Sequence, residues 1–223
     1  MTRVMQVKRT GGPEVLTWEE KTLSTPGEGE VRLRHSAIGL NYIDVYFRSG
    51  LYPAELPFVP GLEAAGIVEA VGAGVSGLMP GDRVAYASPP LGAYSEQRVI
   101  PAKVVVKIPD GIGDEQAAAM MLKGMTAEYL LRRTFPVSSG DTILFHAAAG
   151  GVGLIACQWA KHLGATVIGT VGSDEKAELA AAHGCDHPIV YTRENVVERV
   201  RAITGGDGVP VVYDSVGKDT FAD

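Results

Sequence analysis

A glycine-rich stretch, His146-Ala-Ala-Ala-Gly-Gly-Val-Gly153, carries the clearest chemical signal in the sequence. It follows a short apolar run, Thr142–Phe145, that predicts a strand, and leads into an amphipathic segment, Gly151–Leu163, that predicts a helix. Small residues let the backbone approach a pyrophosphate, which then lies on the N–H groups at the helix N-terminus. The usual fingerprint has three glycines, and its places are held here by Ala148, Gly150 and Gly153. The pattern predicts a dinucleotide site, with a tight turn that binds nothing as the alternative.

The end of the next predicted strand, Thr166–Thr170, bears on which dinucleotide is bound. Sites for NAD usually place an acidic residue about 20 positions past the first glycine, where it binds the ribose hydroxyls. Here the strand runs into Val171-Gly172-Ser173, which is neutral, and Lys176 follows. This tip suits a 2'-phosphate and predicts NADPH. Two alternatives stay open: Lys176 only solvates a helix face, or Asp174 or Glu175 binds the ribose.

The first half of the chain predicts the β-rich part of the fold. The opening residues, MTRVMQVKRT, alternate apolar and polar as a half-buried strand does. Up to about residue 110, short apolar runs are separated by Gly and Pro turns; these runs are Val31–Ala37, Ala65–Val71, Arg83–Ala87 and Val104–Ile108. This spacing is typical of a small barrel or sandwich.

From Asp114 onward the pattern changes to that of an α/β domain. A helix is predicted from Asp114 to about Arg133, and strands then alternate with helices, which indicates a parallel sheet covered by helices. The predicted elements beyond those already named are Asp174–His183, His187–Val190, Asn195–Ile203 and Val209–Asp214. The helix after the glycine-rich loop has an apolar stripe that should pack on the sheet, formed by Val152, Ile155, Ala156, Trp159, Ala160 and Leu163.

Composition and charge exclude several classes of function. The 223 residues are 46% hydrophobic and 21% charged, as in a globular protein that buries a core. A net charge of -6 argues against binding nucleic acid or anionic membranes. The two cysteines, the absence of a signal peptide and the lack of any run of about 18 apolar residues predict a cytoplasmic protein.

One histidine- and cysteine-containing segment, His183-Gly-Cys-Asp-His187, has the composition of a metal site. Gly184 is expected to end a helix there and His187 to begin a strand, so the side chains need not converge. His146 is expected to support the phosphate loop rather than to act as a base.

Taken together, the motifs resemble the zinc-free, zeta-crystallin-like NADPH:quinone oxidoreductases of the medium-chain dehydrogenase/reductase superfamily. The motifs that carry the resemblance are Gly11–Leu16, Ile38–Asp44, Arg48–Pro53, Gln116–Thr126, His146–Gly153 and Val212–Gly217. The resemblance implies the N-terminal portion of a GroES-like catalytic domain over residues 1–125. It further implies an incomplete Rossmann domain over residues 126–223, NADPH in the cleft between the domains, and a homodimer built through the Rossmann sheets. Members of the family continue beyond the point where this sequence stops, so we expect the apolar face near Val209–Val212 to need further chain to cover it.

The resemblance also predicts that the site holds no metal. Zinc-bearing relatives carry a Cys just after the motif that reads Gly39-Leu40 here, and a Gly-His-Glu further on. This sequence has Asn41 in the first region and Gly61-Leu62-Glu63 in the second, so the thiolate and imidazole ligands are missing. A catalytic zinc needs about three protein ligands of this kind.

Candidate site residues follow from the same motifs. Asn41, Tyr46 and Tyr52 are the candidate catalytic groups, and a hydroxyl of Tyr46 or Tyr52 could bind a quinone oxygen; the alternative is that these aromatic rings form the wall of the pocket and hold the cofactor. The candidate cofactor-binding residues are Asn41, Thr126, Gly150, Gly151, Val152, Gly153, Ser173, Lys176, Tyr191 and Ser215. Without a Lewis acid, alcohol oxidation loses its main electrostatic aid, whereas quinones need mainly orientation and a proton.

Two other functions compete with quinone reduction by hydride transfer from NADPH. A zinc-free NADPH-dependent reductase of α,β-unsaturated carbonyls would use the same cofactor and a related cleft. A non-catalytic role, as a crystallin-like or RNA-binding protein, is disfavoured by the net charge of -6 and by the intact phosphate loop.

Overall fold

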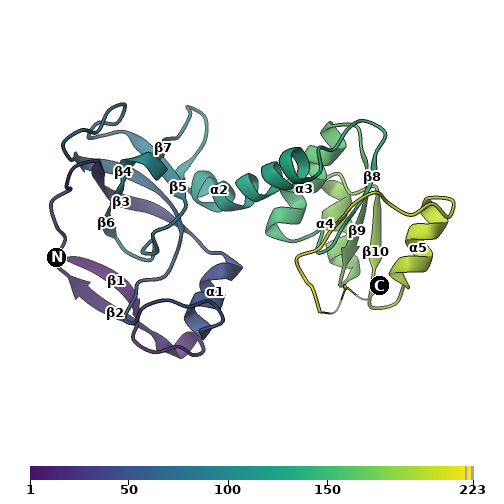
Figure 1. Ribbon diagram of the computed structural model, residues 1–223, viewed down its shortest axis with the longest axis horizontal. Helices are drawn as coiled ribbons and strands as arrows, with labels where there is room; N and C mark the ends of the chain where they lie inside the picture. The colour runs from purple at the N-terminus through teal and green to yellow at the C-terminus, as the bar shows by residue number, and fades with distance from the viewer. Residues whose placement is uncertain (219, 222–223) are drawn as a thin grey trace. The chain divides into compact units, whose positions relative to one another are not determined.

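The computed structural model describes residues 1–218 and 220–221 and divides the chain into two compact units, Met1–Leu122 and Lys123–Asp223 (Figure 1). The first unit contains a five-stranded antiparallel sheet in the order β6-β3-β4-β5-β7 and a separate hairpin, β1-β2. The strands are β1 (Thr2–Val7), β2 (Leu16–Lys21), β3 (Glu30–Gly39), β4 (Glu63–Val71), β5 (Arg83–Ala87), β6 (Gln97–Pro101) and β7 (Val106–Lys107). Short 3-10 turns, Pro13–Val15 and Ala102–Val104, complete this β-rich unit.

Several elements of the first unit differ from the sequence prediction. β2, β6 and the helix α1 (Tyr42–Ser49) were not predicted, and the run expected at Val104–Ile108 forms only the two-residue β7. These differences do not interrupt the core of the sheet. Val31, Leu33 and Tyr86 are fully buried in one hydrophobic cluster.

The second unit has the strand order β10-β9-β8-β11, with every pair parallel. Its elements are β8 (Thr142–Phe145), α3 (Gly151–His162), β9 (Thr166–Val171), α4 (Asp174–Ala182), β10 (His187–Val190), α5 (Val196–Ile203) and β11 (Val212–Tyr213). The order turns back at β8, and in such doubly wound sheets ligands bind beyond the carboxyl ends of the strands at this switch point. The predicted Rossmann-type sheet is therefore confirmed, and the phosphate loop lies at its switch point.

Helix packing in this unit follows the predicted stripe. Ala156 and Ala160 of α3 are fully buried in the main core cluster, and Val152, Ile155, Trp159 and Leu163 pack against it. The long helix α2 (Asp114–Tyr129) belongs to the first unit up to Leu122 and to the second from Lys123, and it ends in a π-helical turn, Leu130–Thr134, close to the predicted end. β11 is shorter than predicted, since Pro210 offers no N–H to the ladder. Within the described residues, no helix is both long and apolar enough to cross a bilayer.

Candidate functional site

The loop between β8 and α3 has the backbone geometry of a phosphate cradle. Ala147 has a positive φ of 55°, which is rare for a residue with a Cβ and marks local strain. Gly150 is the N-cap of α3 in extended conformation. A Cβ on Gly153 would lie 2.5 Å from the carbonyl oxygens of both Ala147 and Ala148. Glycine at 153 thus lets the first turn of α3 pack directly on the loop, with its N–H groups facing the position of an anion.

Ala148 replaces the first glycine of the fingerprint without disturbing the loop. Its side chain is fully buried, and its N–H donates to the carbonyl of Thr170 on β9 at 3.0 Å. A Cβ on Gly169, also on β9, would lie 2.5 Å from the Ala148 methyl group. The space that the loop alanine needs is therefore provided by a glycine on the neighbouring strand.

His146 connects this loop to the strands on either side. Its Nδ1 lies 2.9 Å from the hydroxyl of Thr170, and its N–H donates to the carbonyl of Tyr213 on β11 at 3.0 Å. The side chain is buried, and these contacts are of the kind that a residue supporting the loop would make.

A cavity of about 510 Å³ opens at the carboxyl ends of β8, β9 and β10. Among the predicted cofactor residues, Gly150, Lys176 and Tyr191 line it. The others do not: Asn41, Thr126, Gly151, Val152, Gly153, Ser173 and Ser215. Sequence reasoning missed several lining residues in the segment after β10, notably Glu194, Asn195 and Val196. The available signal was Asn195, an N-cap residue at the start of a predicted helix; its side chain accepts from the N–H of Glu198 at 3.0 Å.

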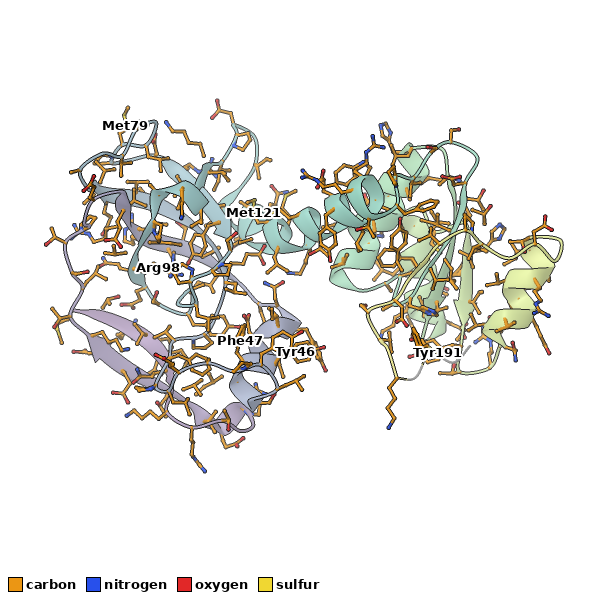
Figure 2. All side chains as sticks on the ribbon, viewed as in Figure 1. Tyr46, Phe47, Met79, Arg98, Met121 and Tyr191 are labelled. Atoms are coloured by element: carbon orange, nitrogen blue, oxygen red, sulfur yellow. The ribbon has the colours of Figure 1, made fainter. Side chains whose placement is uncertain are left out.

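The β9–α4 turn and the residue after β10 carry hydroxyl and ammonium groups near the cavity, and of these residues Lys176 and Tyr191 line it. Ser173 is the N-cap of α4, and its Oγ accepts a long hydrogen bond from the N–H of Lys176 at 3.4 Å. Tyr191, labelled in Figure 2, follows β10 and is 57% exposed. A Cβ on Gly172 would lie 2.9 Å from the Tyr191 hydroxyl, so glycine leaves room for that group. These groups can donate to a phosphate.

Two carboxylates next to these residues are already engaged. Arg193 binds Asp174 through two hydrogen bonds, Nη1 to Oδ2 at 2.8 Å and Nη2 to Oδ1 at 2.6 Å, and this contact lowers the pKa of the Asp174 carboxyl. A hydrogen bond from the Ser173 hydroxyl lowers the pKa of Glu175.

The side chains of the segment 183–187 go to different partners. His183 Nδ1 bonds the carbonyl of Leu179 at 2.8 Å, the thiol of Cys185 points to the carbonyl of Val167, and Asp186 pairs with Lys161. These three side chains therefore do not converge on one point, and the sequence offered no reason to expect that they would. In the part of the chain that the structure describes, no group of three or more His, Cys, Asp or Glu side chains could hold a metal.

In the first unit, Asn41 is held between two buried carboxylates. It is the N-cap of α1, where its N–H donates to Asp44 Oδ2 at 3.0 Å, and its amide Nδ2 donates to Glu63 Oε2 at 2.7 Å. Glu63 is fully buried and its Oε1 accepts from the N–H of Leu122 at 2.8 Å. A Cβ on Gly39 would lie 2.4 Å from Glu63 Oε2, so this glycine makes room for the carboxylate.

Aromatic rings gather along α1 and the segment that follows it. The centroids of Tyr46 and Tyr52 are 5.3 Å apart, as are those of Tyr42 and Tyr46, and Phe47 contacts Tyr52 edge-on at 5.7 Å. Figure 2 shows Tyr46 and Phe47 on α1. Tyr52 is 43% exposed. The structure thus brings Tyr46 and Tyr52 together and sets Asn41 at the start of the same helix.

Comparison with known proteins places both units in one superfamily. Residues 27–110 match the alcohol dehydrogenase GroES-like domain, and residues 151–223 match the family described as zinc-binding dehydrogenase. A quinone oxidoreductase of Pseudomonas aeruginosa is 59% identical over 222 residues, covering 99% of this chain and 68% of that protein. A 2-haloacrylate reductase of a Burkholderia species is 51% identical, with 99% and 68% covered.

Solved structures agree in fold. The quinone oxidoreductase of Escherichia coli, whose structure is a complex with NADPH, superposes with a TM-score of 0.97 at 53% identity, covering all of this chain and 68% of that one. On this identity and coverage, the chain belongs to the quinone oxidoreductase family of the medium-chain dehydrogenase/reductase superfamily.

Proposed function

We propose that this protein is an NADPH-dependent oxidoreductase that reduces quinones by hydride transfer without a metal. The observation that carries the proposal is the phosphate cradle at the switch point of the second unit, with Lys176, Tyr191 and Gly150, the N-cap of α3, at one cavity. The NADPH complex of the Escherichia coli relative, at 53% identity, supports the same cofactor.

The residues at this cavity fit a dinucleotide phosphate. Gly150 and Gly153 would let a pyrophosphate approach the backbone N–H groups at the start of α3, and Gly172 leaves space beside the Tyr191 hydroxyl. Ser173, Lys176 and Tyr191 would bind the 2'-phosphate. We also propose Asn41, Thr126, Gly151, Val152 and Ser215 as cofactor contacts.

The first unit would supply the groups that orient the acceptor. When bound, NADPH supplies the hydride that, with one proton, reduces a quinone to a hydroquinone. A hydroxyl of Tyr46 or Tyr52 would donate a hydrogen bond to a quinone oxygen, and the neighbouring rings would exclude water from it. Asn41 is fixed by Glu63 and by its place at the start of α1, so its amide would present the same orientation to every ligand.

The Asn41–Glu63 contact supports a reaction without zinc. The amide and the carboxylate bind each other directly at 2.7 Å, and Leu62 precedes the carboxylate. An amide nitrogen and a leucine offer none of the thiolate or imidazole ligands that zinc prefers. A quinone accepts electrons readily and needs orientation and a proton rather than a Lewis acid.

A second candidate is the reduction of α,β-unsaturated carbonyl compounds. It is favoured by the 51% identity to a 2-haloacrylate reductase, and a quinone is itself a conjugated enone. The two functions are separated by steady-state rates of NADPH oxidation with a benzoquinone, a naphthoquinone, a 2-alkenal and a 2-haloacrylate. We expect kcat/KM to be highest for a quinone; a higher value for the alkenal or the haloacrylate would overturn the quinone assignment.

Further proposals concern organisation. We propose the N-terminal portion of a GroES-like domain over residues 1–125, a Rossmann domain over residues 126–223, a homodimer of the full-length protein and a cytoplasmic location. We propose no nucleic-acid partner, and a salt-dependent gel shift with RNA would contradict that. Light scattering coupled to size-exclusion chromatography tests the dimer.

A further inference from the structure

A bidentate ion pair lies beside one corner of the proposed cofactor cavity: Arg193 adjoins the lining residue Glu194, and Asp174 lies two residues before the lining residue Lys176. Asp174 is the first residue of α4, directly after the N-cap Ser173. Arg193 lies in the turn that follows β10, where its N–H donates to the carbonyl of Val190 at 3.1 Å. The guanidinium and the carboxylate meet through two hydrogen bonds of 2.6 and 2.8 Å, the geometry in which arginine binds carboxylates most specifically.

We infer that Arg193 determines cofactor specificity by occupying the carboxylate of Asp174. In a site for NADH, an acidic residue at the end of the second strand binds the ribose hydroxyls. Asp174 lies next to Ser173 and two residues before Lys176, so a free carboxylate there would bind a ribose or repel a 2'-phosphate. The pair with Arg193 neutralises it and holds its oxygens. This inference rests on the proposed NADPH site.

The other charges near this corner are consistent with that role. Glu194 lines the cavity, but its Oε1 accepts from the N–H of Val190 at 2.9 Å and its Oε2 pairs with Arg199 at 2.9 Å. Glu175 bonds the Ser173 hydroxyl. Among the described residues around the cavity, Lys176 is the cation that forms no ion pair. The ammonium group is thus left to attract a phosphate.

The expected effect is moderate, because the pair is about half exposed, at 56% for Arg193 and 66% for Asp174. Repulsion between a freed carboxylate and a doubly charged phosphate at a solvated surface corresponds to about threefold to tenfold in affinity. NADH lacks that phosphate, and a freed Asp174 could bind its ribose. A freed Asp174 would thus weaken NADPH and favour NADH, so the ratio of the NADPH to the NADH dissociation constant should change more than either constant alone.

A double-mutant cycle tests the inference. Dissociation constants for NADPH and NADH are measured by fluorescence titration for wild type, Arg193→Ala, Asp174→Asn and the double variant, at low and physiological salt. We expect Arg193→Ala to weaken NADPH by about threefold to tenfold and NADH not at all, with a smaller effect at high salt. The double variant should recover to within about twofold of wild type, because the repelling charge is gone. Arg133→Ala, which removes an exposed arginine from its pair with Glu128 in the same unit, is the matched control and should change neither constant.

Three outcomes would overturn the inference. A double variant as weak as Arg193→Ala would mean that Arg193 contacts the phosphate itself. Equal weakening of NADPH and NADH binding in Arg193→Ala would mean that the ion pair only stabilises the local fold. A wild type that binds NADH as tightly as NADPH overturns the proposed cofactor and this inference together, whereas a wild type that prefers NADPH without recovery in the double variant overturns this inference alone.

Discussion

Replacing Gly153 by alanine tests the close packing of α3 on the phosphate loop. The new methyl group would lie 2.5 Å from two backbone oxygens, those of Ala147 and Ala148, where ordinary contacts begin at 3.4 Å. Backbone oxygens of a tight loop cannot turn away as a side chain can, so the first turn of α3 must retreat. Alanine gains up to about 1 kcal/mol in helix propensity, whereas overpacking costs about 1–3 kcal/mol. We expect a net loss of about 1–2 kcal/mol in the free energy of unfolding.

Gly124→Ala is the matched control, because Gly124 lies inside α2 and a Cβ there would meet nothing within 4 Å. It should stabilise the protein by about 0.5–1 kcal/mol. The chain has two tryptophans, and Trp159 lies on α3. In a background with the exposed Trp18 replaced by Phe, urea unfolding followed by tryptophan fluorescence therefore reports on the second unit.

The same variants are titrated with NADPH. Retreat of α3 moves its N–H groups away from the pyrophosphate, so Gly153→Ala should weaken NADPH while Gly124→Ala should not. If Gly153→Ala is as stable as Gly124→Ala and binds NADPH as tightly as wild type, the packing argument is wrong.

Three further predictions concern single side chains. Lys176→Ala should weaken the binding of NADPH by close to tenfold and leave the binding of NADH unchanged. A hydrogen bond to a charged group contributes about 1.5–3 kcal/mol, and the lower end applies because Lys176 is exposed. Equal weakening of both would contradict the role of Lys176 at the 2'-phosphate. Glu63→Gln places an amide where a buried carboxylate now accepts from Asn41, so the free energy of unfolding should fall by about 1–3 kcal/mol. Glu69→Gln on the same strand should have a smaller effect, and equal effects would contradict a stabilising role of the Asn41–Glu63 hydrogen bond. Burial lowers the pKa of His35 to about 4 from 6.5, so below pH 6.5 the unfolded chain binds a proton that the folded chain does not. This group alone should cost up to about 1.4 kcal/mol of stability per pH unit between pH 6.5 and about 4. In acid melts His35→Gln should remove this contribution and leave the loss that comes from carboxylates with a lowered pKa, such as Asp174; an unchanged slope would contradict the argument.

Sequence reasoning succeeded where local pattern and chemistry coincide. The strand Thr142–Phe145, the glycine-rich loop and the helix from Gly151 were predicted at their observed positions, because a phosphate loop requires that order of elements. The strand His187–Val190 was also placed correctly. Short apolar runs bounded by glycine are informative when strands and helices alternate regularly.

The first unit was harder because its signals are short. α1 has eight residues with aromatic and charged side chains mixed, although Asn41 and Asp44 form a capping box and Gly50 ends the helix. That motif was present in the sequence and was not used. β6 was missed for a similar reason, since five residues ending in proline carry little periodicity.

Contacts between distant residues could not be predicted from either unit's local pattern. Asn41 meets Glu63 only because β4 pairs antiparallel with β3, and Asp174 meets Arg193 only because α4 and the turn after β10 lie at the same edge of a parallel sheet. Sequence left the role of Asp174 open for that reason.

Turnover without zinc is the most direct test of the proposed reaction. Protein dialysed against a chelator is assayed for NADPH oxidation with a benzoquinone, and the zinc content of the same sample is measured by elemental analysis. We expect full turnover with far less than one zinc per chain, and no change when zinc is added back. Close to one zinc per chain in untreated protein, with turnover lost on dialysis and restored by zinc, would contradict a metal-free reaction.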